Sequence, residues 1–212
     1  MIRVRHRLKP STEMRDRPRD RILDAASTLF SLQGFAGTSI EQVIAACGIG
    51  RDTFYRRFNS KLALFEAVAL RERERIDARF AAFVSTSHDE PLKQLEAAAR
   101  WLLDVNLRPE LIAMKRIAFS EARVFGRAAQ DATSPIVDHL IALVGRLQEN
   151  GTFADDCDAA RIVSFVINAL VLGPMMEAML AETPGHDDAW QRDYFDRTWP
   201  MIVSGLLERK NY

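Results

Sequence analysis

The sequence is poor in residues that build covalent or metal-bound scaffolds. Its 212 residues include two cysteines, Cys47 and Cys157, and four histidines. Because the cysteines are far apart in sequence and form no CxxC pair, we expect neither a disulfide framework nor a zinc finger, and a reducing cytoplasm suits the chain. Aromatic residues make up 8% of the sequence and hydrophobic residues 48%, a composition typical of a soluble helical protein.

Motifs of the common enzyme classes are also missing. The histidines are scattered, and no H-E-x-x-H, G-x-S-x-G, Walker or G-x-G-x-x-G pattern occurs. The acidic run Asp155-Asp156-Cys157-Asp158 fits the start of a helix better than a metal site. We therefore expect no enzyme activity, no cofactor and no bound metal.

No alternating strand pattern, 20–50-residue repeat or low-complexity segment is present. The predicted fold class is all-α. One apolar run, residues 162–180, is long enough to raise the possibility of a membrane span. Ser164, Asn168 and Glu177 lie inside it, and polar groups in hydrocarbon cost several kcal/mol. We therefore expect a buried helix, and the absence of an apolar run in the first 20 residues argues against a signal peptide.

The net charge of zero hides an asymmetry between the two ends of the chain. Residues 1–61 hold 12 Lys and Arg against 6 Asp and Glu, whereas residues 62–212 hold 17 against 23. A basic head on an acidic body is typical of a DNA-binding module joined to a separate regulatory domain.

A short helix is predicted over residues 40–47. Its apolar residues recur at i, i+3, i+4 and i+7: Ile40, Val43, Ile44 and Cys47. Two capping boxes are available at its start, Thr38 with Glu41 or Ser39 with Gln42. Gly48 ends it, because glycine adopts the left-handed backbone that follows many helices at little cost.

A second helix is predicted from Gly50 to about Phe58. Phe54 and Phe58 lie four residues apart and point inward. The polar residues share a different side: Arg51, Asp52, Tyr55, Arg56 and Asn59. Two short helices joined by a glycine turn predict a helix-turn-helix that places its second helix in the major groove of DNA. An ordinary helical hairpin with a solvated charged face is the alternative.

At these residues the chain resembles the TetR family of bacterial repressors. The resemblance is carried by an ordered series: Ile22-Leu23-Asp24-Ala25-Ala26, Leu29-Phe30, Gly34-Phe35, Thr38-Ser39, Cys47-Gly48-Ile49-Gly50, Thr53-Phe54-Tyr55-Arg56-Arg57-Phe58, Ser60-Lys61-Leu62 and Leu64-Phe65. No single dipeptide in the series is specific, but its order is.

The resemblance implies an N-terminal three-helix helix-turn-helix domain followed by a larger helical domain for effector binding and dimerisation. We expect a flexible basic arm at residues 1–18, the DNA-binding domain at 19–65 and the C-terminal domain at 66–212. The arm is either a solvated tail or a segment that contacts phosphates or the minor groove. The family also implies a homodimer built from the last two helices of each subunit.

The predicted DNA-contacting residues are Thr38, Ser39, Gly50, Arg51, Asp52, Thr53, Tyr55, Arg56 and Lys61. The hydroxyls of Thr38 and Ser39 stand at a helix start, where they and the free amides can hold a phosphate. The resemblance implies phosphate contacts at Tyr55, Arg56 and Lys61. Arg51 is the candidate base reader, through a bidentate contact to guanine O6 and N7.

Three positions depart from the pattern of the family. Asp52 replaces a small residue, and its carboxylate either accepts from cytosine N4 or pairs with Arg56; we favour the pair, because phosphates repel a carboxylate. Ile44 stands where alanine is usual, which is expected to change the angle between the two helices. Gly50 stands where a serine cap is common, which is expected to loosen the start of the second helix.

Helical spacing and stop signals predict the remaining helices. The first helix of the chain is expected from about Arg19 to Gln33, ended by Gly34, and a later one over 61–84, capped by Asn59 or Ser60. The body is expected to form helices at about 90–106, 109–125, 134–149, 156–181 and 188–208. Pro200 is expected to bend or split the last of these.

A ligand pocket and a dimer seam are predicted in the body. The pocket candidates are Trp101, Met114, Phe119, Phe125, Phe165, Asn168, Met175, Met176 and Met179; plain core packing is the alternative for each. Methionines and few interior charges indicate a small hydrophobic or aromatic effector. The seam candidates are Val166, Leu170, Phe195, Trp199, Ile202, Val203 and Leu206.

These features predict a cytoplasmic, homodimeric transcriptional regulator that binds a double-stranded palindromic operator. A repressor released by the effector is expected, and activation stays open. The alternatives are a regulator of the same fold controlled by a protein partner or without a small-molecule ligand, and a helical ligand-binding protein that does not bind DNA.

Overall fold

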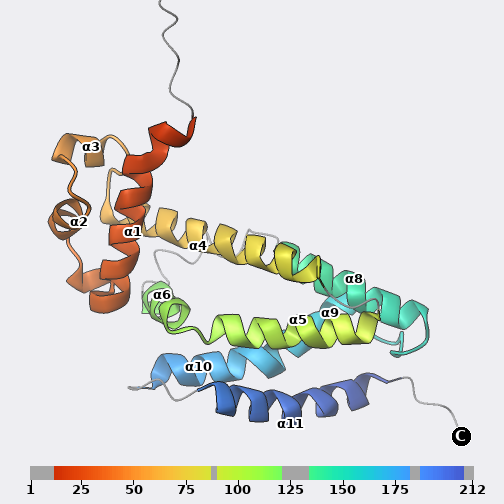
Figure 1. The fold of residues 1–212 in the computed structure, drawn as a ribbon. Coiled ribbons are helices and arrows are strands. Elements are labelled where there is room, and N and C mark those ends of the chain that lie inside the picture. The colour runs from red at the N-terminus through yellow and green to blue at the C-terminus, as the bar shows by residue number, and fades with distance from the viewer. Residues whose placement is uncertain (1–11, 87–89, 121–133, 182–186, 208–212) are drawn as a thin grey trace, which may run out of the picture. The chain divides into compact units, whose positions relative to one another are not determined.

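The computed structural model describes residues 12–86, 90–120, 134–181 and 187–207 (Figure 1). Within these ranges the regular structure is helical and contains no strand. Phe153 and Leu207 form an isolated antiparallel bridge. The elements in order are α1 (Thr12–Gly37), α2 (Ile40–Cys47), α3 (Arg51–Tyr55), α4 (Lys61–Val84), α5 (Pro91–Asn106), α6 (Pro109–Ser120), α8 (Pro135–Glu149), α9 (Ala159–Ile167), η1 (Asn168–Leu172), α10 (Gly173–Leu180) and α11 (Asp188–Leu206). The all-α prediction is confirmed.

The chain divides into two compact units, residues 1–73 and 74–212. The boundary lies inside the continuous helix α4, and not at residues 65 and 66 as predicted. The reason is that the first turns of α4 belong to the core of the first unit, where Leu64, Phe65 and Val68 are buried.

The first unit is built on α1, whose side chains Ile22, Leu23, Ala26 and Phe30 are buried. This helix begins at Thr12, upstream of the predicted start near Arg19 and inside the segment expected to be a flexible arm. The apolar pattern begins only at Ile22, but the residues before it include good helix formers, and α1 continues through Pro18.

Gly34 interrupts α1 as predicted. Its φ of 72° and ψ of 176° lie outside the helical region, so the chain bends there. Phe35 then folds back beneath the unit and stacks on Phe30, with ring centroids 5.8 Å apart, and meets Phe65 edge-on at 5.7 Å. These three rings fix the segment between α1 and α2.

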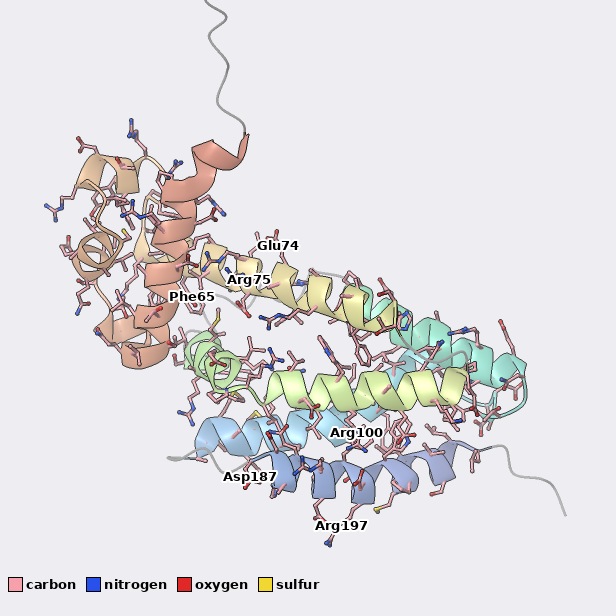
Figure 2. The ribbon with its side chains drawn as sticks, viewed as in Figure 1. Phe65, Glu74, Arg75, Arg100, Asp187 and Arg197 are labelled. Carbon is pink, nitrogen blue, oxygen red and sulfur yellow. The ribbon has the colours of Figure 1, made fainter. Side chains whose placement is uncertain are left out.

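In the second unit, α5 packs against α8, η1 and α11, and α8 packs against α9 (Figure 1). Figure 2 shows Arg100 on the side of α5 that faces α11. Its guanidinium contacts Asp196 at 2.6 Å and lies 4.0 Å from the centroid of the Phe195 ring. A cation over an aromatic face, combined with a carboxylate, joins the two helices.

The apolar run predicted as one helix over 156–181 forms α9, η1 and α10 in succession. The wide π-helical turn of η1 lies just before Pro174, which has no N–H to donate to the preceding turn. Among the described helices, residues Ala159–Leu180 are the one stretch with the length and hydropathy of a membrane span, and 39% of its most apolar window is buried within the protein.

Most of the predicted seam is the core of the subunit itself. Five of the seven candidates are buried in the hydrophobic core, namely Val166, Leu170, Phe195, Trp199 and Ile202, and the other two, Val203 and Leu206, pack against it. The helices that carry these side chains pack against α5, α8 and η1 of the same subunit, so the buried side chains have no surface left for a second subunit. The predicted seam is therefore wrong for the buried five.

Pro200 lies inside α11 without splitting it. A proline in a helix removes one backbone hydrogen bond and crowds the preceding turn. Pro200 is exposed, so water reaches the carbonyl that lacks its partner, and the helix continues to Leu206.

The burial of Phe195 gives a test of its place in the core. We expect Phe195→Ala to lower the free energy of unfolding by about 3–5 kcal/mol, because it leaves a cavity. Phe119→Ala is the control, because Phe119 is 56% exposed and exposed substitutions change stability by about 0.5 kcal/mol or less. Urea denaturation followed by circular dichroism measures both, and equal small effects would contradict the assignment.

Candidate nucleic-acid interface

The start of α2 is held by a reciprocal capping box. Ser39 Oγ accepts from the Gln42 N–H at 3.1 Å, and Gln42 Oε1 accepts from the Ser39 N–H at 2.7 Å. Of the two predicted boxes, the structure contains the one formed by Ser39 and Gln42. Val43 and Cys47 of this helix are buried, and the two other residues of its apolar face are half-buried.

Thr38 and Lys61 are occupied by protein contacts, contrary to the predicted roles in phosphate binding. Thr38 is 1% exposed, and its hydroxyl donates to Gly34 O at 2.8 Å. Lys61 Nζ donates to the carbonyls of Phe35 and Thr38 at 2.6 and 2.9 Å and lies 4.5 Å from the Phe35 ring centroid. Both residues secure the loop before α2, because its free carbonyls attract the ammonium.

A shallow depression of about 330 Å³ lies beside the start of α2. Its lining consists of Ala36, Gly37, Thr38, Ser39, Ile40, Glu41 and Lys61. The partly exposed ammonium of Lys61 and the amino-terminal end of a helix dipole both favour a negative group at this place. Lys61 therefore contributes positive potential to the depression even though its hydrogen bonds go to carbonyls.

The turn between α2 and α3 follows the predicted glycine chemistry. Gly48 has the left-handed backbone, with φ 61° and ψ 40°, and its N–H donates to Ile44 O. Arg21 reaches across from α1 and donates to Cys47 O. Gly50 then caps α3 with an extended backbone and no side-chain hydrogen bond.

The helix α3 presents two different sides. Phe54 is fully buried and Phe58 is 5% exposed, with their ring centroids 5.9 Å apart. The polar residues Arg51, Asp52, Tyr55, Arg56 and Arg57 are exposed. The regular helix ends at Tyr55, earlier than predicted, and the chain continues in a turn to Phe58. The predicted division into an aromatic underside and a polar outer side is thus present.

The guanidinium of Arg51 pairs with Glu41 of α2 at 2.7 Å, and both side chains are more than half exposed. The pKa of the Glu41 carboxyl is held below its ordinary value by a hydrogen bond from its own backbone N–H and by the bond from Arg51. Glu41 was not among the predicted site residues. Its place opposite Arg51 depends on how α2 crosses α3, which no local pattern specifies.

The predicted pair between Asp52 and Arg56 is wrong. Arg56 donates instead to the Thr53 hydroxyl, at 3.4 Å, and the Asp52 carboxylate is exposed. Because Arg56 follows the last residue of a very short helix, its side chain extends back toward Thr53. The outer side of α3 therefore keeps an unneutralised carboxylate next to its cations.

The predicted pocket residues are dispersed. Phe119, Phe165 and Asn168 are exposed, so they do not line an enclosed cavity of the subunit, and Phe125 lies outside the described residues. Met175 is buried in the core, while Trp101, Met114, Met176 and Met179 are half-buried. For these five, the ligand-lining role stays a prediction.

Two further expectations concern the termini and metal binding. Residues 1–11 of the predicted basic arm lie outside the described residues. In the acidic run, Asp158 stands at the N-cap of α9 but makes no side-chain capping bond. The described part of the chain contains no cluster of three or more His, Cys, Asp or Glu side chains that could hold a metal.

Comparison with known proteins places the first unit in a family. Residues 22–68 match the family described as bacterial regulatory proteins, tetR family. This part of the chain is a TetR-family domain. The regulator UidR of Escherichia coli K12 is 40% identical over 70 residues, which cover 33% of this chain and 36% of UidR. The matched part is thus about a third of that relative's length.

Longer matches include both units of the chain. The transcriptional repressor KstR of Rhodococcus jostii is 29% identical over 150 residues, covering 70% of this chain and 68% of KstR. A candidate TetR-family regulator from Mesorhizobium loti has the same fold, with a TM-score of 0.77 at 21% identity over 93% of this chain and all of the other. A candidate regulator from Saccharomonospora viridis, solved with choline, has a TM-score of 0.72 at 18% identity, covering 90% of this chain and 98% of that one.

The two glycines of the turn give a matched pair of variants. We expect Gly48→Ala to destabilise the protein by about 1–2 kcal/mol, because an L-residue is strained in the left-handed region, and an added Cβ would lie 3.3 Å from the Arg21 guanidinium. Gly50→Ala has open space and a φ of −74°, so it is expected to be neutral or to stabilise by about 0.4–1 kcal/mol. Thermal melts compare them, and equal losses would contradict this account of the turn.

Proposed function

We propose that the chain is a sequence-specific DNA-binding transcriptional regulator, acting as a homodimeric repressor that a small-molecule effector releases from a palindromic operator. The division of α3 carries this proposal. Its aromatic side is buried in the first unit, while Arg51, Tyr55 and Arg56 are exposed. The tetR-family match of residues 22–68 supports the same conclusion.

The exposed side chains of α3 fit the two tasks of DNA recognition. Arg51 suits bidentate contact with guanine, worth about 1–3 kcal/mol in discrimination. Tyr55 and Arg56 suit phosphate contacts, which set the register of the helix in the groove. We assign Ser39, which caps α2, and Gly50, Asp52 and Thr53, at the start of α3, to the same interface.

A dimer is proposed because a helix of five residues reads only a few base pairs, whereas two copies on a palindrome multiply the specificity. Because most of the dimer seam predicted from the sequence is buried, we assign the dimer contact to exposed apolar side chains of the consecutive helices α9, η1 and α10. Phe165 and Leu172 lie seven residues apart, and Leu180 ends the same run, with exposures of 55%, 40% and 79%. Apolar groups of this size exposed along one helix are typical of interaction surfaces.

Repression and effector control are proposed from the relatives. KstR is a transcriptional repressor, and the fold of the second unit occurs in a regulator solved with choline and in a gamma-butyrolactone receptor with a TM-score of 0.59. An effector that favours a conformation unsuited to the operator lowers the affinity of the protein for the operator. By linkage, the operator lowers the affinity for the effector by the same factor. We place the protein in the cytoplasm, where its operator would be.

The role of Arg51 is testable by selecting an operator from a library of random duplexes and measuring binding by fluorescence anisotropy. We expect Arg51→Ala to weaken operator binding by about 10–100-fold, since a guanine contact is lost. Arg56→Ala is expected to weaken all duplexes alike and to reduce the salt slope by about one.

Arg197→Ala is the control, because Arg197 is an exposed arginine of the second unit that pairs with Asp193 (Figure 2). It should leave DNA affinity unchanged. DNA reading by α3 would be contradicted if the selection enriched no sequence, or if Arg51→Ala and Arg56→Ala left the affinity for the operator unchanged.

The dimer contact is testable with two phenylalanines of nearly equal exposure. We expect Phe165→Asp to convert the dimer into a monomer, because a carboxylate would be buried against an apolar partner surface. Phe119→Asp should leave the dimer intact, since Phe119 is 56% and Phe165 55% exposed but only Phe165 lies on the proposed seam. Light scattering after size exclusion measures the mass, and a Phe165→Asp dimer would disprove this seam.

A further inference from the structure

The side chain of Lys115 is half-buried in the second unit. It extends from α6 into the junction with the end of α5 and with α10, where its Nζ contacts Asn106 Oδ1 and lies 2.9 Å from Met175 Sδ. Asn106 itself donates to Leu102 O at 2.7 Å, so its amide is oriented with its oxygen toward the ammonium.

This environment is a poor one for a cation. An ammonium has three N–H donors, and within the described part of the chain its acceptors are one amide oxygen and one thioether, which is a weak acceptor. Burial lowers the pKa of Lys115 to about 8, and no carboxylate is among the causes that shift it. The ammonium nevertheless remains the main form near neutral pH.

Other basic residues of the same unit form ion pairs with carboxylates. Lys93, Arg100 and Arg197 pair with Glu90, Asp196 and Asp193 at 2.6–2.9 Å. Each of those carboxylates supplies the counter-charge that Lys115 lacks among the described residues. A methionine or glutamine at position 115 would fill the space at lower cost, because a charge that is partly removed from water and has no counter-charge is destabilising.

We propose that Lys115 anchors the anionic group of a small carboxylate with an apolar body, bound at the junction of α5, α6 and α10. This inference rests on the proposed control by an effector and names its chemical class. The carboxylate takes the N–H donor that has no strong acceptor and supplies the missing negative charge. Asn106 holds the ammonium in position, and Met175 offers an adaptable apolar contact to the body of the ligand.

The neighbouring Arg116 makes this junction a place where a ligand affects α10. Its guanidinium donates to the carbonyls of Met179, Ala178 and Ala181 at 2.6–2.8 Å, which closes the C-terminal end of α10. A ligand held by Lys115 enters beside Met175 on the same helix. The ligand would therefore contact α10, the helix that ends at Leu180, and Leu180 is part of the proposed dimer contact.

The test is calorimetric titration of the full-length protein, without DNA, with butanoate, hexanoate, octanoate and phenylacetate and with the corresponding uncharged amides. We expect at least one carboxylate to bind about tenfold or more tightly than its amide, the factor expected of a charged hydrogen bond. Lys115→Met should bring the carboxylate down to the affinity of the amide. The variant should still fold, because it removes a half-buried charge that has no counter-charge among the described residues, and a thermal melt checks this.

Lys93→Met is the matched control, since Lys93 is an exposed lysine of the same unit paired with Glu90; it should keep the preference for the carboxylate. The proposal is overturned if no carboxylate binds more tightly than its amide, or if Lys115→Met retains the preference. Because no DNA is present, either result leaves the DNA-binding proposal standing, and a failed operator selection would leave the Lys115 result intact.

Discussion

Burial of the Phe54 ring is the contact on which the proposed interface depends. The regular part of α3 has five residues, too few for a helix to form alone. The conformational entropy lost in nucleating a helix exceeds the free energy gained from the hydrogen bonds of a single turn. The helix exists because Phe54 is fully enclosed and Phe58 packs beside it. The same packing determines which side of α3 faces away from the core, so the position of Arg51 follows from where the phenylalanines lie.

The helices were predictable because their signals are local. Helix α4 spans 61–84 as predicted, and Ser60, one of two proposed caps, accepts from the Ala63 N–H at 3.0 Å. Prolines in the first turn mark the starts of α5 and α8, and the positive φ of Gly151 follows the end of α8. Capping residues, prolines and glycines act within one turn, so a single sequence contains their effect.

The wrong assignments concern side chains whose surroundings come from distant segments. An apolar stripe shows that a helix buries a face, but it does not say against what, and Phe195 and Trp199 proved to face their own core. Similarly, the sequence motif contains Thr38 and Lys61, but only the folded loop shows that a carbonyl of Gly34 and those of Phe35 and Thr38 take their donors. Lys115 was overlooked because nothing near it in the sequence distinguishes it from a solvated lysine.

The pairing of Arg51 with Glu41 has a consequence for selectivity in a DNA-reading protein. Before it touches a duplex, Arg51 already has a carboxylate partner, so exchanging that partner for an arbitrary phosphate brings little net gain. A guanine edge offers two planar acceptors instead, while the displaced carboxylate is repelled by the surrounding phosphates. If α3 reads DNA as proposed, the carboxylate of Glu41 would weaken non-specific binding to DNA, and Arg51 would contribute most at the correct base sequence.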